Sequence, residues 1–340
     1  MMERPDQEPQ QTEKNPKSDV VRSNILTAAA GASYLLCLLA ATAILVIEPK
    51  ERIKLGLWQA KRSSSLISLP KVRSQGIGIV KLEGMIAMER KGAFMGDNMV
   101  ERVNKSLAKL AAKDSVKAII LRINSPGGMV ASSQEIYAQV TRLRQKHNKP
   151  IVALLGDVAA SGGYYIASAC DSIVAQPGTL TGSIGVIFQT GEFAGLFKKY
   201  GIEFNTIKSG RYKDIGNFSR AMTPDERRIL QDVIDSAYEQ FVGAVADGRK
   251  LPAATVKELA DGRIYIGDNA MKLHLVDSTG GYQAAIDIAK ELGGIDGEPE
   301  IVTDTNIRED IIGELFKANA LTDLKVLLPP AGLLYLWTGY

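Results

Sequence analysis

Histidine and cysteine are both scarce in this chain, and their scarcity limits the chemistry open to it. The 340 residues include two cysteines, Cys37 and Cys170, and each stands in an apolar stretch. This count argues against a disulfide framework and against a thiolate metal site. The two histidines are His147, at a predicted helix end, and His274, among short packing elements. Neither setting is typical of the histidine in a Ser-His-Asp triad.

Motifs for nucleic-acid and phosphate binding are also absent. The chain has 41 Lys and Arg against 38 Asp and Glu, a net charge of +3, and no basic run interleaved with aromatic residues. This pattern argues against a nucleic-acid partner. Neither GxxxxGK[ST] nor GxGxxG occurs, which argues against nucleotide binding. The composition, 45% hydrophobic and 23% charged, is instead typical of a globular protein with a substantial core.

The N-terminal part contains a long apolar run between polar flanks. Residues 1–24 are mostly polar and predict a disordered tail. Residues 25–47 form an uncharged, apolar run. This run is long enough for a transmembrane helix and too long for the apolar part of a signal peptide. We therefore expect an uncleaved single-pass anchor, followed by a connector at residues 48–74. The Lys and Arg counts beside the run lean weakly toward a cytoplasmic domain, but long domains translocate regardless of such counts, so the orientation stays open.

Alternating strand and helix patterns predict one α/β domain over residues 75–295. Such alternation is typical of right-handed crossovers and a largely parallel sheet. The predicted strands are residues 77–82, 117–124, 150–156, 181–187 and 202–207, and the predicted helices are residues 98–113, 130–146, 193–200, 270–273 and 282–292.

The sequence Thr223-Pro-Asp-Glu226 is a strong helix start, with Thr as N-cap, Pro at the first position and Glu three residues after the cap. We expect this helix to reach about Asp247. The residues that it should bury are Leu230, Val233, Ile234, Ala237, Phe241 and Val245. A C-terminal extension, residues 296–340, ends in an apolar tail over residues 321–340. This tail could pack on the domain, occupy a groove, form a subunit contact or touch the membrane.

Two glycine-rich turns carry the candidate chemistry. Ser161 stands between small residues in GDVAASGGYYIASA, residues 156–169, where a predicted strand gives way to a helix. A serine at such a turn is accessible as a nucleophile, although it could instead be a simple N-cap. The turn Ser125-Pro-Gly-Gly128 offers open backbone N–H groups, which suit an oxyanion hole but also occur in ordinary turns.

A serine nucleophile needs a base, and neither histidine is well placed to serve. A lysine can accept the serine proton if it is desolvated and therefore often neutral. Most lysines of this chain are expected to be solvated. Lys213 differs from them only by its setting, a polar, glycine-containing loop after a predicted strand.

Four motifs, in order and at fitting spacing, resemble the signal peptide peptidase A family of serine–lysine peptidases. They are Asn124-Ser-Pro-Gly-Gly128, Ala160-Ser-Gly-Gly-Tyr-Tyr-Ile-Ala167, Thr181-Gly-Ser-Ile-Gly-Val186 and Lys208-Ser-Gly-Arg-Tyr-Lys-Asp214. Residues 261–267 and 275–277 resemble the end of that family's domain. The likeness covers about residues 75–295 and fits the short, unduplicated form. It implies a crotonase-like (Clp-protease-like) α/β fold with repeated ββα-type units, here preceded by one transmembrane helix.

The resemblance also implies a role for individual residues. Ser161 matches the nucleophile, and Lys213 matches the general base. Ser183 matches the serine that orients this lysine. Gly128 matches the oxyanion-hole glycine, acting with a backbone N–H at or next to Ser161, for which we name Gly162. The mechanism needs no metal and no organic cofactor.

For function, the resemblance implies a membrane-anchored serine endopeptidase that degrades cleaved signal peptides and similar apolar peptides through an acyl-enzyme. It further implies a ring-shaped homo-oligomer, in which adjacent protomers can supply Ser and Lys, and a catalytic domain on the outer or periplasmic side of the cell (inner) membrane. Two alternatives remain open from the residues: an acyl-CoA enzyme of the crotonase class, since glycine turns can also hold a thioester oxyanion, and a catalytically silent membrane scaffold.

Overall fold

The computed structural model describes residues 75–88, 98–304 and 334–336, all within one compact unit, Val72–Tyr340. The predicted tail, transmembrane anchor and connector, residues 1–24, 25–47 and 48–74, lie outside the described residues. Within the described part of the chain, no helix is both long enough and apolar enough to span a bilayer.

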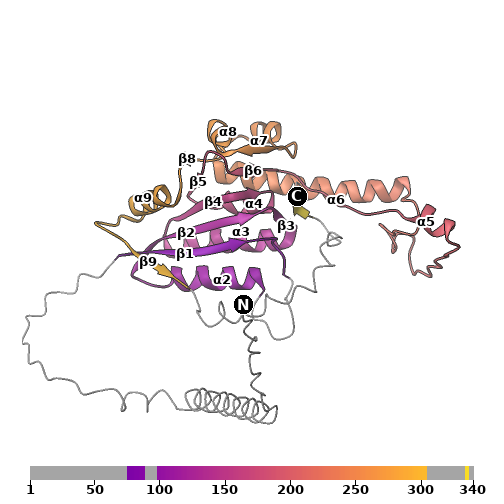
Figure 1. Cartoon of the computed structure of the whole chain (residues 1–340), viewed down its shortest axis with the longest axis horizontal. Coiled ribbons are helices and arrows are strands. Elements are labelled where there is room, and N and C mark those ends of the chain that lie inside the picture. The colour runs from indigo at the N-terminus through magenta and orange to yellow at the C-terminus, as the bar shows by residue number, and fades with distance from the viewer. Residues whose placement is uncertain (1–74, 89–97, 305–333, 337–340) are drawn as a thin grey trace, which may run out of the picture. The chain divides into compact units, whose positions relative to one another are not determined.

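A mostly parallel sheet forms the centre of the unit (Figure 1). Its strands are β1 (Gly76–Glu83), β2 (Val116–Ser125), β4 (Ile151–Ala160), β5 (Ser172–Ala175), β6 (Leu180–Gly182), β7 (Ile264–Ile266), β8 (Ser278–Thr279) and β9 (Glu300–Thr303). The main order is β7-β6-β4-β2-β1-β9, and only the β6–β7 pair is antiparallel. The sheet confirms the predicted α/β class. Strand β4 is longer than predicted and pairs first with β5 and then, through its last three residues, with β6.

Helices cover both faces of this sheet, which explains why its central strands are apolar runs. Successive residues of a strand point to opposite faces. In β2, Ile119, Leu121 and Ile123 therefore join a core with α2 (Met99–Ala111), α3 (Val130–His147) and α4 (Gly162–Ala167). Ala118 and Ile120 face the other way and pack with α9 (Tyr282–Gly293). The predicted helices in these regions are confirmed.

The long helix α6 (Pro224–Arg249) starts as predicted, with Thr223 and Glu226 forming a capping box. Its C-terminal half is buried through Ala237, Phe241 and Val245. The expected burial is wrong for the N-terminal half, where Val233 is 42% exposed and Leu230 and Ile234 are only half-buried. Figure 1 shows the reason: this half extends beyond the sheet, toward α5 (Ala194–Lys199).

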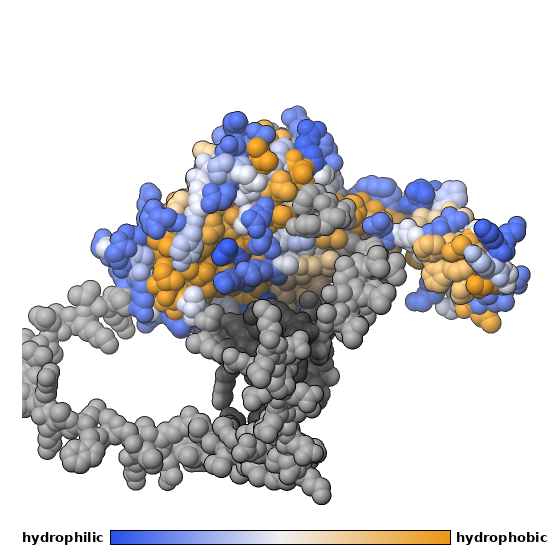
Figure 2. Space-filling model, viewed as in Figure 1, coloured by the Kyte–Doolittle hydropathy of each residue, from blue (hydrophilic) through white to orange (hydrophobic). Residues whose placement is uncertain are grey.

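Residues 185–236, which we call the arm, contain no strand, so the strand predicted at 202–207 is wrong. The strand predicted at 181–187 is also wrong beyond Gly182, where β6 ends at a φ of +80°. The arm has its own small core of aromatic rings, Phe193, Phe197, Phe204 and Phe218. Many of its other apolar side chains are exposed (Figure 2), including Leu196, Tyr200, Ile202 and Ile207.

Several short elements have no counterpart in the sequence prediction. Helix α7 (Ala253–Leu259) follows α6, while α8 (Gly267–Lys272) lies close to the helix predicted at 270–273. A second, two-stranded sheet pairs β3 (Gly127–Met129) with β10 (Leu334–Leu336) in antiparallel register. This pairing brings a segment of the C-terminal extension onto one of the two glycine-rich turns.

Candidate active site

Ser161 occupies a sharp turn between β4 and α4. Its φ of 52° and ψ of −117° are a conformation that a residue with a side chain rarely adopts, at a cost of about 1–3 kcal/mol. Its N–H donates to the Gly182 carbonyl at 2.8 Å, and its own carbonyl accepts from Tyr165 N at 2.8 Å. The side chain makes no capping hydrogen bond to α4, so the N-cap interpretation is not supported.

Glycine at position 162 allows α4 to approach β3. A Cβ at Gly162 would lie 2.5 Å from Ser133 Oγ and 3.2 Å from Gly128 N. Carbon and oxygen do not approach this closely without displacement. The absence of a side chain therefore keeps the N-terminal end of α4 beside Gly128, and both residues match oxyanion-hole positions of the sequence prediction.

On one side, the turn that contains Gly128 is fixed by hydrogen bonds to Gly84 and Ile86. Ser125 Oγ donates to the Gly84 carbonyl at 2.7 Å and accepts from Gly127 N at 3.1 Å. Gly127 O and Met129 N both bond to Ile86, each at 2.8 Å. Because N–H and C=O groups alternate along a strand, the Gly128 N–H points to the opposite edge of β3. That edge faces β10.

Strand β10 lies on this edge with Tyr335 directly opposite Gly128. The Tyr335 carbonyl oxygen is close to both glycine turns: a Cβ at Gly162 would be 3.2 Å from it, and a Cβ at Gly127 would be 2.0 Å from it. The carbonyl of an extended peptide thus lies among the backbone groups predicted to bind an oxyanion. The sequence analysis gave a groove-bound tail as one of several possibilities and did not single out Tyr335.

The Tyr335 side chain fills a buried aromatic pocket. Its ring stacks on Tyr165 at 5.1 Å between centroids and packs against Phe241 at 4.6 Å. Its hydroxyl donates to the Ala237 carbonyl of α6 at 2.9 Å, and the side chain is completely buried. Burial raises the pKa of Tyr165 to about 12, so this ring stays uncharged. The pocket is therefore mainly aromatic, with the Ala237 carbonyl as the acceptor for the Tyr335 hydroxyl.

Ser183 is held close to the Ser161 turn. It directly follows Gly182, whose carbonyl binds Ser161 N, and its own N–H donates to the Arg263 carbonyl at 2.8 Å. Its φ of 50° and its 7% exposure mark a second constrained serine. The structure thus brings Ser161, Gly128, Gly162 and Ser183 together.

Lys213 is not brought to this group within one chain. It is exposed and lies in the arm, next to Asp214, which is tied through Arg220 to Glu226 in the first turn of α6. At 1.5 Å per residue, Glu226 is about 17 Å along the helix from Ala237, where the aromatic pocket begins. One chain therefore brings Ser161 close to Gly128, Gly162 and Ser183 but not to Lys213, and the catalytic roles of these residues stay predictions.

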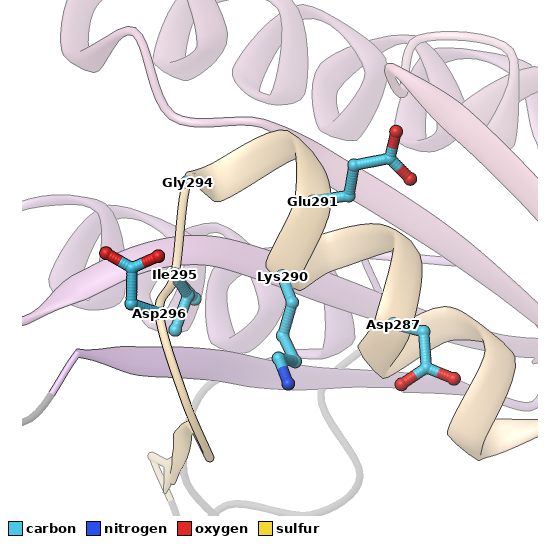
Figure 3. A pocket seen from close by; sticks show the side chains of 6 residues that line it. All are labelled: Asp287, Lys290, Glu291, Gly294, Ile295 and Asp296. Carbon is cyan, nitrogen blue, oxygen red and sulfur yellow. The ribbon is translucent and has the colours of Figure 1, made fainter.

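Other candidate groups fit the site less well. His147 ends α3, about 26 Å along that helix from Val130 beside the site. Burial raises the pKa of the Cys170 thiol to about 12, which keeps it unreactive. A surface hollow of about 420 Å³ at the end of α9 (Figure 3) is lined mainly by charged side chains, and its lining includes no serine, threonine or cysteine.

Comparison with known proteins places the chain in a family. Residues 143–296 match the family model of peptidase family S49, and residues 83–178 match that of Clp protease. A candidate protease of Synechocystis sp. is 47% identical over 188 residues, which are 55% of this chain and 67% of that protein. The chain belongs to peptidase family S49. A candidate protease of Methanocaldococcus jannaschii is also similar, with 38% identity over 65% of this chain and 68% of that protein.

Membership of family S49 makes the chain a serine peptidase with a Clp-protease-like α/β fold, as the motifs predict. The resemblance to signal peptide peptidase A is confirmed as well. A candidate signal peptide peptidase SppA of Enterococcus faecium is 40% identical over 54% of each chain. These relatives favour proteolysis over the acyl-CoA alternative.

Proposed function

We propose that this S49 peptidase is a membrane-anchored endopeptidase that cleaves signal peptides and similar apolar peptides bound in extended form along β3. The observation that carries this proposal is β10. A segment of the chain itself lies on β3 as an added strand, with a carbonyl at the glycine turns and a side chain in an apolar pocket. Adding a strand to a sheet edge is a general mode of peptide recognition, and alternate side chains supply its specificity.

In the proposed reaction, Ser161 Oγ attacks the peptide carbonyl while Lys213 Nζ takes the hydroxyl proton. The Gly128 and Gly162 N–H groups stabilise the oxyanion. The C–N bond then breaks, the lysine returns the proton to the leaving amine, and an acyl-enzyme remains. A water molecule, deprotonated by the same lysine, attacks the acyl carbon and releases Ser161. Ser183 orients the lysine throughout.

Lys213 reaches the serine of a neighbouring protomer in this proposal. This proposal is supported by the place of Lys213 in the arm, next to a residue that Arg220 ties to the start of α6. The exposed apolar side chains of the arm offer a surface for a second copy. A closed ring satisfies every such head-to-tail contact. The anchor predicted at residues 25–47 holds the ring at the cell membrane, with the catalytic domains on the outer or periplasmic side, where membrane-derived apolar peptides are met.

The first test is the mass of the C-terminus. In the full-length chain we expect cleavage between Tyr335 and Leu336, because the Tyr335 carbonyl lies at the proposed oxyanion site. Mass spectrometry should find this cut in the wild type and an intact terminus in Ser161→Ala. Intact termini in both proteins would show that the strand on β3 is not held as a substrate.

The second test mixes two inactive variants. Ser161→Ala retains the lysine and Lys213→Ala retains the serine, so co-expressed protomers can form a complete site only across an interface. We expect hydrolysis of an apolar fluorogenic peptide to recover to about a quarter of the wild-type rate, if the protomers assemble at random in a ring. No recovery in co-assembled oligomers would exclude a shared site.

A further inference from the structure

The arm contains a connected group of ion pairs that the peptidase mechanism above does not use. Arg220 is at its centre. Its Nε donates to Asp214 Oδ2 at 3.0 Å, and its terminal nitrogens donate to the two Glu226 carboxylate oxygens at 2.8 and 2.5 Å. Lys208 Nζ donates to the other Asp214 oxygen at 2.5 Å. One guanidinium therefore bridges two carboxylates that are twelve residues apart in the sequence.

This group is unusually well shielded for the arm. The side chains of Asp214 and Glu226 are only 10% and 3% exposed. In the neighbouring pair, Arg211 is 71% exposed and its partner Asp225, in the first turn of α6, is 35% exposed. Hydrogen bonds from Arg220 lower the pKa of Glu226 to about 2 and lower that of Asp214 further. Both carboxylates are consequently ionised at neutral pH. The planar guanidinium of an arginine can bridge two carboxylates better than the ammonium group of a lysine.

The bridge also holds the main chain directly after Lys213. Arg220 Nη2 donates to the Asp214 carbonyl at 3.2 Å, and a turn beside it is closed by Lys213 N to Gly210 O at 3.1 Å. At the other end, Glu226 Oε2 accepts from Thr223 N at 2.9 Å in the capping box of α6. Asp214, the residue after Lys213, is thus linked through Arg220 to the first turn of α6.

We propose that Arg220 is a positioning residue for catalysis, because it fixes the turn that carries Lys213 to the start of α6. The inference rests on the proposed role of Lys213 as general base. A base must come within hydrogen-bond distance of the nucleophile, and a displacement of about 1 Å can cost about 100-fold in rate. A flexible lysine on a surface loop meets this requirement only if its main chain is fixed.

The test uses the full-length protein and an apolar fluorogenic peptide. Arg220→Lys keeps the charge but cannot bridge both carboxylates, so we expect kcat to fall by at least about tenfold with KM changed by less than about twofold. The matched control is Arg211→Lys, on the same loop in an exposed pair, which should change kcat by less than about twofold. An unchanged kcat in Arg220→Lys would overturn the proposal.

A double-mutant cycle separates positioning from general damage. Asp214→Asn should also lower kcat, and Asp214→Asn combined with Arg220→Lys should be no slower than the slower single variant, because both act through one contact. If the kcat losses of the two single variants instead multiply in the double variant, the proposal is contradicted. A loss of oligomeric size in Arg220→Lys would also contradict the proposal, since it would indicate a merely structural role.

Lys213→Ala, measured in parallel, distinguishes the two levels of failure. If Lys213→Ala retains wild-type kcat, the proposed function itself fails. If Lys213→Ala is inactive while Arg220→Lys is fully active, only the positioning role of Arg220 fails.

Discussion

At the scale of single residues, Gly162 shows that the site has no room for a side chain at the start of α4. Gly162→Ala would place a methyl group 2.5 Å from Ser133 Oγ and so push α4 away from Gly128. We expect kcat to fall by about 100-fold or more, the usual cost of losing an oxyanion-hole donor. The control is Gly178→Ala, where nothing lies within 4 Å of the new Cβ. Equal activity of the two variants in a peptide hydrolysis assay would exclude an oxyanion role for this turn.

Cys170 provides a second test at this scale, of the core behind α4. The thiol is buried and its pKa is raised to about 12, so almost no thiolate exists at pH 8. In the native protein we expect iodoacetamide to leave Cys170 unmodified, and denaturant to make it fully reactive. Peptide mapping of the alkylated protein measures this. Rapid labelling of the native form would mean that the core is open there.

At the scale of elements, β10 should compete with added peptides because it occupies the strand position on β3. In the Ser161→Ala background, a chain ending at residue 333 should bind an apolar peptide at least about tenfold more tightly than the full-length chain, since the tail is a tethered competitor. Fluorescence anisotropy gives both dissociation constants. Equal values would show that β10 does not block the peptide site.

The start of α6 should be sensitive to acid. The pKa of Glu226 is about 2 in the folded chain, below its ordinary value of 4.5, because Arg220 and Thr223 bond its carboxylate. A lowered pKa contributes stability that is present above pH 4.5 and is lost as the pH falls toward 2. The unfolding temperature should therefore fall more steeply over this window in the wild type than in Glu226→Gln. Parallel curves from calorimetry would contradict this.

The sequence was most informative where an element carries its own signal. The capping box of α6 and the periodic helices α2 and α3 formed as predicted, because caps and one apolar face are local properties. Residues 202–207 have a strand-like pattern but no neighbouring strand in the arm, so they stay irregular. Val233 follows a core-like spacing on a half-helix that leaves the core. Both predictions were wrong because the structure of these residues depends on their tertiary surroundings, about which the periodicity of the sequence carries no information.

At the scale of the whole molecule, the motifs pointed to Ser161 and to the two glycine turns, which the structure places close together, because each lies within a few residues of a strand end. They did not reveal the approach of Tyr335 to Gly128, which joins residues more than 200 positions apart. They also did not reveal the distance of Lys213 from Ser161. In the proposed ring, that distance is a property of the assembly, and a single chain displays only half of the site.

The central claim is that Ser161 and Lys213 act as nucleophile and base, and peptide hydrolysis across pH tests it most directly. The wild type, Ser161→Ala and Lys213→Ala should be compared on one apolar fluorogenic peptide. Both variants should lose at least about 1,000-fold in kcat, and wild-type activity should rise with pH, because only a neutral lysine accepts the serine proton. Wild-type activity in either variant would contradict the account.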